Sequence, residues 1–338
     1  MSNLVIGWLP GKVCLGLSDR AGARKRLTHR IAERPSPPYL PRMRYAAHQR
    51  FIEPARPTKE PWRLIAGLLL LMVLFLALNW GLDAVIALLG GRELSTALTR
   101  LTQDQSGPGF ALASLFRLGF LGVACILTVR TLHRRGGRSL FGDTKRALGQ
   151  GGRVLVALAL LYAAIAVLPP WGSDLQPEPN LPFGLWLSLL PLSLVAIIVQ
   201  SGAEELVFRG YLQQQLAARF ASPLIWAALP TALFAALHYA PALAGENAGL
   251  VALWAAAFGI AAADLTARAG TLGPAIAFHA FNNATALLLL GVAGNFDGLA
   301  LYVLPVEMTD TAAIPALMLV DLCILFVGWL AARLAIRA

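Results

Sequence analysis

Charged residues are scarce in this 338-residue chain: Asp, Glu, Lys and Arg together make up 14%, whereas hydrophobic residues make up 57%. The mean hydropathy is +0.64. A soluble globular domain has about 25% charged residues, so the composition excludes an ordinary soluble fold and indicates a protein that crosses a bilayer several times. Cysteine is also scarce. Cys14, Cys125 and Cys323 have no paired spacing, which excludes a disulfide framework and a thiolate metal site.

Acidic residues are fewer than basic ones, 18 against 28, and the formal net charge is +10. A basic chain can bind nucleic acid, but the positions of the basic residues argue against that partner. Thirteen Lys and Arg residues precede residue 64, and most of the others fall in alternate loops, five of them in the connection 131–152. This alternation is the positive-inside pattern of membrane proteins. We therefore expect both termini to be cytoplasmic and the surroundings to be a lipid bilayer, with no nucleic acid partner.

Long apolar runs are the main structural signal. A run of about 20 apolar residues is long enough to cross the hydrocarbon core as a helix. The sequence predicts eight such helices, at 64–89, 110–130, 153–169, 183–218, 223–241, 248–267, 271–292 and 313–332. The predicted fold class is an all-α, polytopic membrane helix bundle that spans 62–338. Residues 1–61 are rich in Arg and Pro and lack an apolar period, so we expect a basic cytoplasmic tail without fixed structure.

Ionisable residues are rare inside the apolar runs, and they cluster. The clusters read Glu204-Glu205-x-x-x-Arg209, Phe234-x-x-x-His238 and His279-x-x-x-Asn283. A charge at the membrane midplane costs roughly 2.5–3.5 kcal/mol on insertion scales, so such groups indicate a functional site. His238 and His279 are also the only two of the five histidines that lie inside apolar runs.

Helical geometry predicts which of these side chains meet. Glu205 and Arg209 are four residues apart and share a face, so we expect them to neutralise each other as a structural pair. Glu204 is rotated by about 100° from Glu205 and points elsewhere. The helices at 183–218 and 223–241 turn near Ala221, which is 17 residues from both Glu204 and His238. An antiparallel hairpin therefore brings Glu204 and His238 to one level.

His279 and Asn283 share a face in the same way. We expect them to join Glu204 and His238 in one pocket in the cytoplasmic half of the bilayer, with Phe234 packed beside His238. Two chemistries fit these residues. Glu204 can act as general base toward water while His279 and Asn283 donate to an oxyanion. Alternatively, Glu204, His238 and His279 are the ligand types of a catalytic zinc with an open position, and the sequence leaves both chemistries open.

In this order, and on successive membrane helices, the motifs EExxxR, FxxxH and HxxxN resemble those of the CPBP family. This family comprises type II CAAX prenyl-endopeptidases and related bacteriocin-processing and self-immunity membrane proteins. The resemblance covers about 195–290, within a predicted protease-like core at about 183–292. It implies an intramembrane endopeptidase, of metallo or glutamate type, with a cavity that opens to the cytoplasm.

The same resemblance implies roles for the residues. Glu204 and His238 would activate the attacking water, and His279 and Asn283 would stabilise the oxyanion. Glu205 and Arg209 would support the site. The implied substrate is a membrane-associated protein or peptide, in the CAAX case a lipidated one. We expect an integral protein of a bacterial inner membrane.

A non-enzymatic function is the alternative. The chain could be a catalytically silent membrane partner, or a proton-coupled transporter that uses Glu204 and His238 as a relay. A relay requires polar residues that continue toward the outer face. Residues 185–199 are apolar apart from Ser188 and Ser193. This pattern favours a blind pocket, and with it the enzyme.

Overall fold

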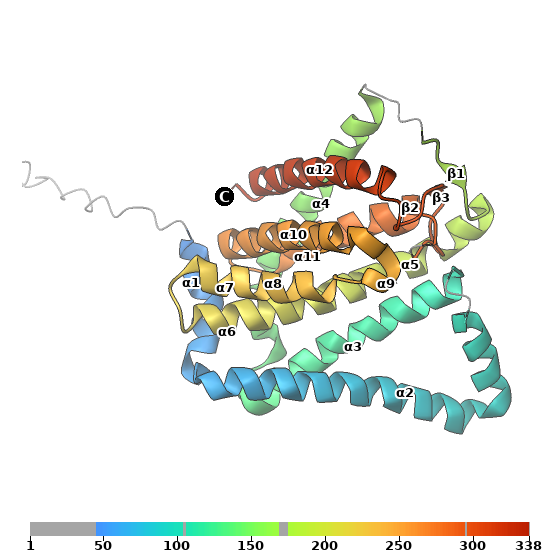
Figure 1. Cartoon of the computed structure of the whole chain (residues 1–338). Helices are drawn as coiled ribbons and strands as arrows, with labels where there is room; N and C mark the ends of the chain where they lie inside the picture. Colours follow the sequence, from blue (N-terminus) through green and yellow to red (C-terminus); the bar gives the residue numbers. More distant parts are fainter. Residues whose placement is uncertain (1–44, 104–105, 169–174, 295, 338) are drawn as a thin grey trace, which may run out of the picture. The chain divides into compact units, whose positions relative to one another are not determined.

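The structure is a computed structural model that describes residues 45–103, 106–168, 175–294 and 296–337. They belong to one compact unit, Arg44–Ala338. Helices build almost all of this unit (Figure 1), so the predicted all-α bundle is confirmed.

All eight predicted segments are helical, although their bounds differ from the expected ones. The first three are α2 (Pro61–Gln103), α3 (Pro108–Leu132) and α4 (Thr144–Val167). The fourth is α5 (Phe183–Glu205), which continues through the π-helical segment η3 (Leu206–Gln213) into α6 (Gln214–Ala217). The others are α7 (Pro223–Trp226) with α8 (Ala228–Leu237), α10 (Ala248–Ala269), α11 (Gly273–Ala284) with the π-helical η5 (Thr285–Leu289), and α12 (Ala313–Ala335).

Six helical stretches of the described residues are long and apolar enough to cross a membrane. They are Pro61–Gly91, Pro108–Leu132, Thr144–Val167, Phe183–Ala217, Pro241–Ala269 and Ala313–Ala335. The predicted spans at 223–241 and 271–292 are shorter than expected. The first ends at Leu237, and the second leaves helical structure at Leu290, where a strand begins. A helix of the length of Pro223–Leu237 is too short for a full crossing of the hydrocarbon.

Local sequence sets several of the helix ends. Proline occupies the first turn of α3, α7 and α11, where its missing N–H costs nothing. Asp143 caps α4, because its side chain accepts a hydrogen bond of 2.7 Å from the backbone N–H of Arg146. Gly270 ends α10 in the left-handed conformation, with φ of 68°. The tight connection to α11 that follows places α10 and α11 side by side.

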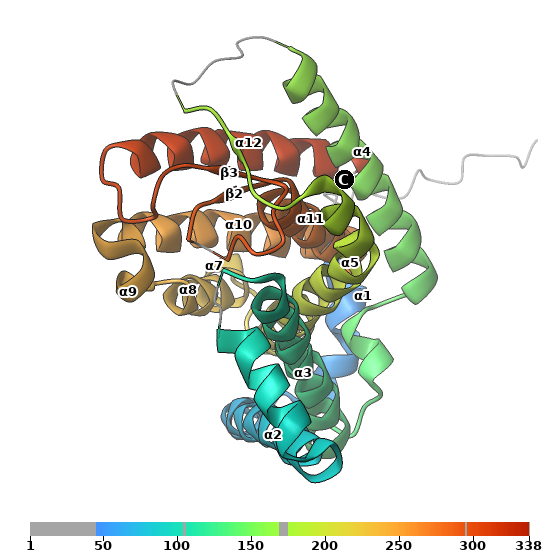
Figure 2. The ribbon, with the colours of Figure 1, turned by 90° about the vertical axis from the view of Figure 1, so that its right-hand side faces the viewer.

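Helix α11 is the central element of the bundle. It contacts α4, α5, α10 and α12, and Figure 2 shows it enclosed by these four. α8 packs on α10, and α3 packs between α2 and α5. The helix that carries the HxxxN motif is therefore surrounded by other helices, and it lies against the helix that carries the EExxxR motif.

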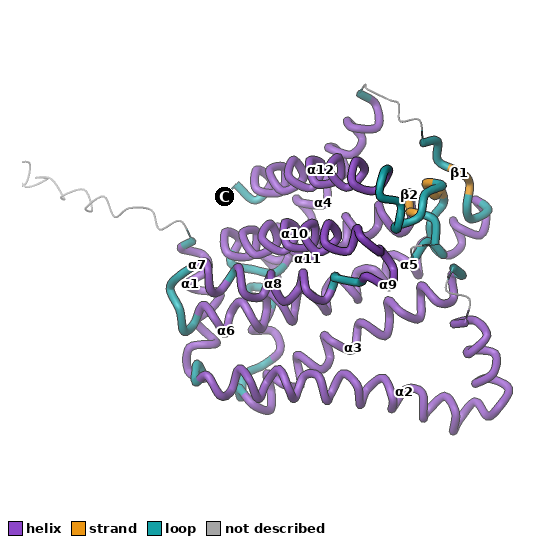
Figure 3. The backbone as a smooth tube through the Cα atoms, in the orientation of Figure 1, coloured by secondary structure: helices purple, strands orange, loops and turns teal. Residues whose placement is uncertain are grey.

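A small three-stranded sheet covers one end of the helices, opposite the end where α1 (Ala46–Ile52) lies (Figures 1 and 3). Its strands are β1 (Glu178–Pro179), β2 (Leu290–Val292) and β3 (Tyr302–Leu304), in the order β1-β3-β2. β3 runs antiparallel to β1 and parallel to β2. The sheet ties the chain after α11 to the connection that precedes α5.

The segment before the first span differs from the expected tail. Residues 1–44 lie outside the described residues, but the next residues form α1 and the short 3-10 helix η1 (Glu53–Thr58). His48, Phe51 and Ile52 of this segment are buried. Gln214 donates a hydrogen bond of 3.0 Å to the carbonyl of Phe51. In contrast to the predicted boundary at residue 61, the ordered bundle includes 45–61, because the apolar face of α1 packs against α6 and α10.

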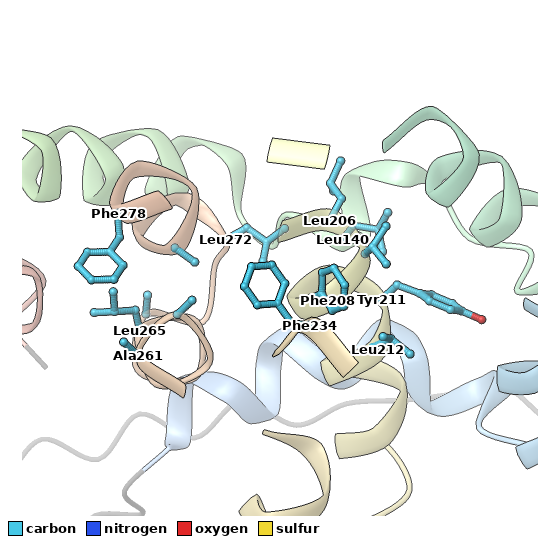
Figure 4. Close-up of a cluster of buried hydrophobic side chains, with 14 of the residues drawn as sticks. Leu140, Leu206, Phe208, Tyr211, Leu212, Phe234, Ala261, Leu265, Leu272 and Phe278 are labelled. Atoms are coloured by element: carbon cyan, nitrogen blue, oxygen red, sulfur yellow. The ribbon is translucent and has the colours of Figure 1, made fainter. Parts of the chain in front are cut away.

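A cluster of buried hydrophobic side chains includes Phe234 of the FxxxH motif (Figure 4). Leu206, Phe208 and Tyr211 of η3 are buried beside Phe234 of α8 and Leu272, which precedes α11. The rings of Phe208 and Phe234 meet edge to face, with centroids 5.0 Å apart. Any charged group among these side chains is therefore removed from water and needs a partner.

Candidate active site

Glu204 and Glu205 are the last two residues of α5, directly before the π-helical segment η3. Segments of π-helix are rare and occur often at functional sites. All eight residues of η3 are buried. The two carboxylates are thus held at the start of a segment that the core encloses on all sides.

Glu205 and Arg209 form the ion pair that the sequence predicts. The Nη1 of Arg209 lies 2.9 Å from Oε1 of Glu205, and the two side chains are 2% and 0% exposed. Nη2 of Arg209 donates to the carbonyl of Gly259 at 3.2 Å, and the guanidinium lies 5.0 Å from the ring centroid of Phe234. A buried charge with these partners is satisfied, and it joins η3 to α8 and α10.

His279 lies between the two carboxylates. Its Nδ1 is 2.8 Å from Oε1 of Glu205, and its Nε2 is 3.8 Å from Oε2 of Glu204. Because an ionised carboxylate only accepts hydrogen bonds, the Nδ1–H of His279 donates to Glu205. The contact between His279 and Glu205 is not among the predicted ones, which pair Glu205 with Arg209 alone. Imidazole has a nitrogen on each of two edges, so two adjacent carboxylates can both approach it.

Glu204 differs from Glu205 in its exposure and in its partners. Its side chain is 12% exposed, whereas that of Glu205 is fully enclosed. Oε1 of Glu204 accepts a hydrogen bond of 2.7 Å from Nε2 of Gln200. Oε2 is buried and has no hydrogen-bond partner among the described residues. Oε2 of Glu205 lacks a partner there too, but Arg209 neutralises that carboxylate. Glu204 is therefore the carboxylate that is partly exposed and has an oxygen with neither a described hydrogen-bond partner nor a paired cation.

Asn283 reaches the same cluster from α11. Its Nδ2 donates to Oε1 of Gln200 at 2.9 Å and lies 3.4 Å from Oγ of Ser201. Gln200 and Ser201 are not among the site residues predicted from the motifs. The signal that could have found Gln200 is its position, since it precedes Glu204 by four residues and shares its helical face.

His238 lies at the C-terminal cap of α8 and is half-buried. Its Nδ1 donates to the carbonyl of Phe234 at 2.8 Å, and its ring lies over that of Phe234 with centroids 4.3 Å apart. In the neutral ring, a donating Nδ1 leaves Nε2 as an acceptor. The ring of Phe234 also meets that of His279 edge to face at 6.2 Å. Phe234 thus packs between the two histidines, and no hydrogen bond joins His238 to Glu204 in the described part of the chain.

The zinc alternative requires Glu204, His238 and His279 to approach one point as ligands. Among the described residues, no three His, Cys, Asp or Glu side chains are grouped closely enough to hold a metal ion. The side chains as placed do not fit a metal centre, and we derive no step through one.

Part of the chain is similar to a known protein family. A family model described as Rce1-like, type II CAAX prenyl endopeptidase, matches residues 185–285. The predicted family resemblance is confirmed. The matched range runs from α5 into η5 and contains all three motifs. It supports a likeness to the type II CAAX prenyl endopeptidase family over this range.

A relative of unknown function is also similar. The uncharacterized protein YyaK of Bacillus subtilis (strain 168) is 30% identical over 132 residues, which are 38% of this chain and 43% of that protein. The chain therefore matches less than half the length of this relative. No solved structure matches the chain.

Proposed function

We propose that the chain is an intramembrane endopeptidase that hydrolyses a peptide bond of a membrane-associated protein or peptide, with Glu204 as the general base. The observation that carries this proposal is the state of Glu204. One of its oxygens is held by Gln200. The other is buried without a hydrogen-bond partner among the described residues, 3.8 Å from Nε2 of His279. A base must accept a proton at a defined position, and this oxygen is the acceptor that the cluster leaves open.

In the proposed reaction, Oε2 of Glu204 takes a proton from water while the water oxygen forms a bond to the carbonyl carbon of the substrate. The acceptor Nε2 of His238 orients the same water. The electron pair of the carbonyl moves to its oxygen and gives a tetrahedral oxyanion. When the C–N bond breaks, the carbonyl forms again and the proton on Glu204 passes to the leaving nitrogen. The products are a carboxylic acid and an amine, and the acid then releases its proton to give the carboxylate.

The oxyanion needs donors in a site from which water is largely excluded. We assign this task to His279 and Asn283, which both come from α11. Glu205 accepts the Nδ1–H of His279 and so orients the ring with Nε2 toward Glu204. The proposal requires Nε2 to carry a proton when the oxyanion forms. Asn283 has a second N–H, which makes only the long contact of 3.4 Å to Ser201 and can donate to the substrate in its place.

Glu205 and Arg209 contribute electrostatics without touching the substrate. Two ionised carboxylates next to each other would repel, and one of them would take up a proton. The guanidinium of Arg209, 2.9 Å from Glu205, cancels one of the two charges. Glu204 can then stay ionised as the base.

The family description suggests a substrate that ends in a prenylated CAAX sequence. A direct test uses the purified full-length chain in liposomes and internally quenched peptides that end in Cys-Ala-Ala-X, one farnesylated and one not. The proposal predicts one cleavage site in at least one peptide, which mass spectrometry of the products locates, and loss of this cleavage in His238→Ala. Both peptides staying intact with the wild-type chain would contradict it.

A chelator arm addresses the metal alternative in the same assay. Incubation with 1,10-phenanthroline, followed by removal of the chelator and elemental analysis of the protein, separates the two chemistries. Base catalysis by Glu204 without a metal predicts an unchanged rate. A rate that falls with the zinc content and returns when zinc is added would assign the activation of water to a metal.

A further inference from the structure

We infer that Gln200 is a positioning residue of this site, which aligns the carboxylate of Glu204 and the amide of Asn283 for the reaction. The inference rests on the proposed function. Gln200 lies on α5, four residues before Glu204, and its side chain is buried, 5% exposed. It belongs to none of the three motifs.

The hydrogen bonds of Gln200 fix the orientation of its amide. Its Oε1 accepts from Nδ2 of Asn283 at 2.9 Å and from the hydroxyl of Ser201 at 3.1 Å. Its Nε2 donates to Oε1 of Glu204 at 2.7 Å. A flipped amide would set an N–H against the donor of Asn283 and a carbonyl against a carboxylate, so both ends select the same orientation.

This arrangement connects the base to an oxyanion donor across two helices. Glu204 lies on α5 and Asn283 on α11, and the amide of Gln200 bridges them. Because Oε1 of Glu204 is bound, only Oε2 stays open on the side of His279. The distance between the proton acceptor and Asn283 then depends on a single short side chain. Misplacement of a reacting group by about 1 Å can cost on the order of 100-fold in rate.

The side-chain amide of Gln200 is also a suitable hydrogen-bond partner for a general base. A lysine or arginine in this place would neutralise Glu204 and make it a poorer proton acceptor, as Arg209 does for Glu205. A glutamine donates one neutral hydrogen bond, which fixes the carboxylate without cancelling its charge. Among the hydrogen-bond partners on α5 and η3, Glu205 thus has the guanidinium of Arg209, and Glu204 has the neutral amide of Gln200.

The competing explanation is that Gln200 only holds helices together. Gln150 on α4 provides a matched case, because it is also 5% exposed. It donates to the carbonyl of Ala269 at 3.4 Å and accepts from the hydroxyl of Thr271 at 2.6 Å, away from the site. Loss of Gln150 therefore removes a buried glutamine and its interhelical bonds without touching Glu204.

The kinetic test compares Gln200→Leu, Gln200→Glu and Gln150→Leu with the wild-type chain, on the peptide that the wild-type chain cleaves. Positioning predicts that Gln200→Leu lowers kcat by about 10- to 100-fold with KM within about 2-fold, since the binding groups remain. Gln150→Leu retains the wild-type kcat. In Gln200→Glu, two neighbouring carboxylates share one proton, so the acidic limb of the pH–rate profile moves to higher pH. Equal kcat in Gln200→Leu and Gln150→Leu would overturn the inference.

A second measurement needs no substrate. Dicyclohexylcarbodiimide modifies accessible carboxyl groups in apolar surroundings, and peptide mass spectrometry quantifies the product at Glu204. Release of Glu204 from its donor predicts faster modification in Gln200→Leu, by about 3-fold or more, and an unchanged rate in Gln150→Leu. Identical rates in the three proteins would refute the positioning role.

The two measurements also separate this inference from the proposed function. A wild-type chain that cleaves no peptide, or a Glu204→Gln variant as active as the wild type, refutes the proposed function. The labelling rates still decide whether Gln200 holds Glu204. Cleavage that depends on Glu204 but not on Gln200 would refute the inference alone.

Discussion

The imidazole of His279 on α11 lies between two adjacent carboxylates of α5, with Nδ1 2.8 Å from Glu205 and Nε2 3.8 Å from Glu204. Glu205 is enclosed and paired with Arg209, whereas Glu204 is partly exposed and retains an oxygen without a partner in the described structure. The two carboxylates are neighbours in sequence but differ in their exposure and in their partners. Of the two, only Glu204 is partly exposed and has an acceptor with neither a described partner nor a paired cation.

Asn283 provides the sharpest test of the oxyanion assignment. Asn283→Leu removes the donor and is expected to lower kcat by about 100- to 1,000-fold, the usual loss for one oxyanion donor, with little change in KM. The adjacent Asn282→Leu is the control, because it removes the same group from a different face of α11. A similar loss of kcat in both variants would show that α11 tolerates no such change, and would refute the specific role of Asn283.

Arg209→Met is expected to destabilise the protein strongly. It leaves the buried charge of Glu205 without its cation, and the loss of one partner of a buried pair costs about 3–5 kcal/mol. Arg56→Met is the matched control, because the pair of Arg56 and Glu53 is exposed and worth at most about 1 kcal/mol. The measurement is reversible unfolding in detergent micelles. Equal effects of the two substitutions would contradict the buried pair.

Stability should fall as the pH drops from about 6.5 to about 4. Burial lowers the pKa of His48 to about 4, and burial together with Arg135 lowers that of His133 to about 4. Both rings act as hydrogen-bond acceptors toward glutamines, His48 toward Gln213 and His133 toward Gln215.

The sign follows from the proton balance. Between pH 4 and pH 6.5 the unfolded chain binds protons that the folded one does not, so acid favours unfolding. The contribution of each neutral ring to the stability of the folded chain is fully present above pH 6.5. Thermal unfolding of His48→Gln and His133→Gln at pH 7.5 and pH 5 is the check. A wild-type unfolding temperature that falls no more than that of the variants would contradict this account.

Truncation tests the ordered segment before the first span. Deletion of residues 2–43 removes no contact that the structure describes, and it should leave the unfolding temperature within about 2 °C of the full chain. Deletion of 2–58 also removes the buried Phe51 and Ile52. Burial of two such side chains contributes about 1.5–3 kcal/mol each, so this deletion should lower the unfolding temperature by several degrees. Equal unfolding temperatures for the two truncated chains would show that α1 and η1 add no stability.

Much of the fold could be predicted from the sequence, because a membrane helix is defined by the length and polarity of one segment. The helical segments and the pair of Glu205 with Arg209 follow from apolar length and four-residue spacing. The packed segment 45–58 could not be predicted in this way. Its order depends on His48 and Phe51 meeting glutamines of η3 and α6, which are more than 150 residues away in sequence.

The site, like the fold, could be predicted only in part from the sequence. Spacing identifies the faces of Glu204, His279 and Asn283, and the structure brings these three together. Spacing does not predict that His279 contacts Glu205, nor that Gln200 bridges Glu204 and Asn283. Those contacts depend on the rotation of α5 against α11. In the described structure no hydrogen bond joins His238 to Glu204, and the ring of His238 packs against that of Phe234 at the end of α8.

The most direct test of the central claim is the rate of peptide cleavage by purified Glu204→Gln beside the wild-type chain. Asp321→Asn, which removes a carboxylate from α12, is the control. The account predicts that Glu204→Gln loses at least about 100-fold in kcat, the contribution of a general base, while its unfolding temperature stays close to that of the wild type. Asp321→Asn should cleave normally. Undiminished cleavage by a folded Glu204→Gln protein would contradict the account.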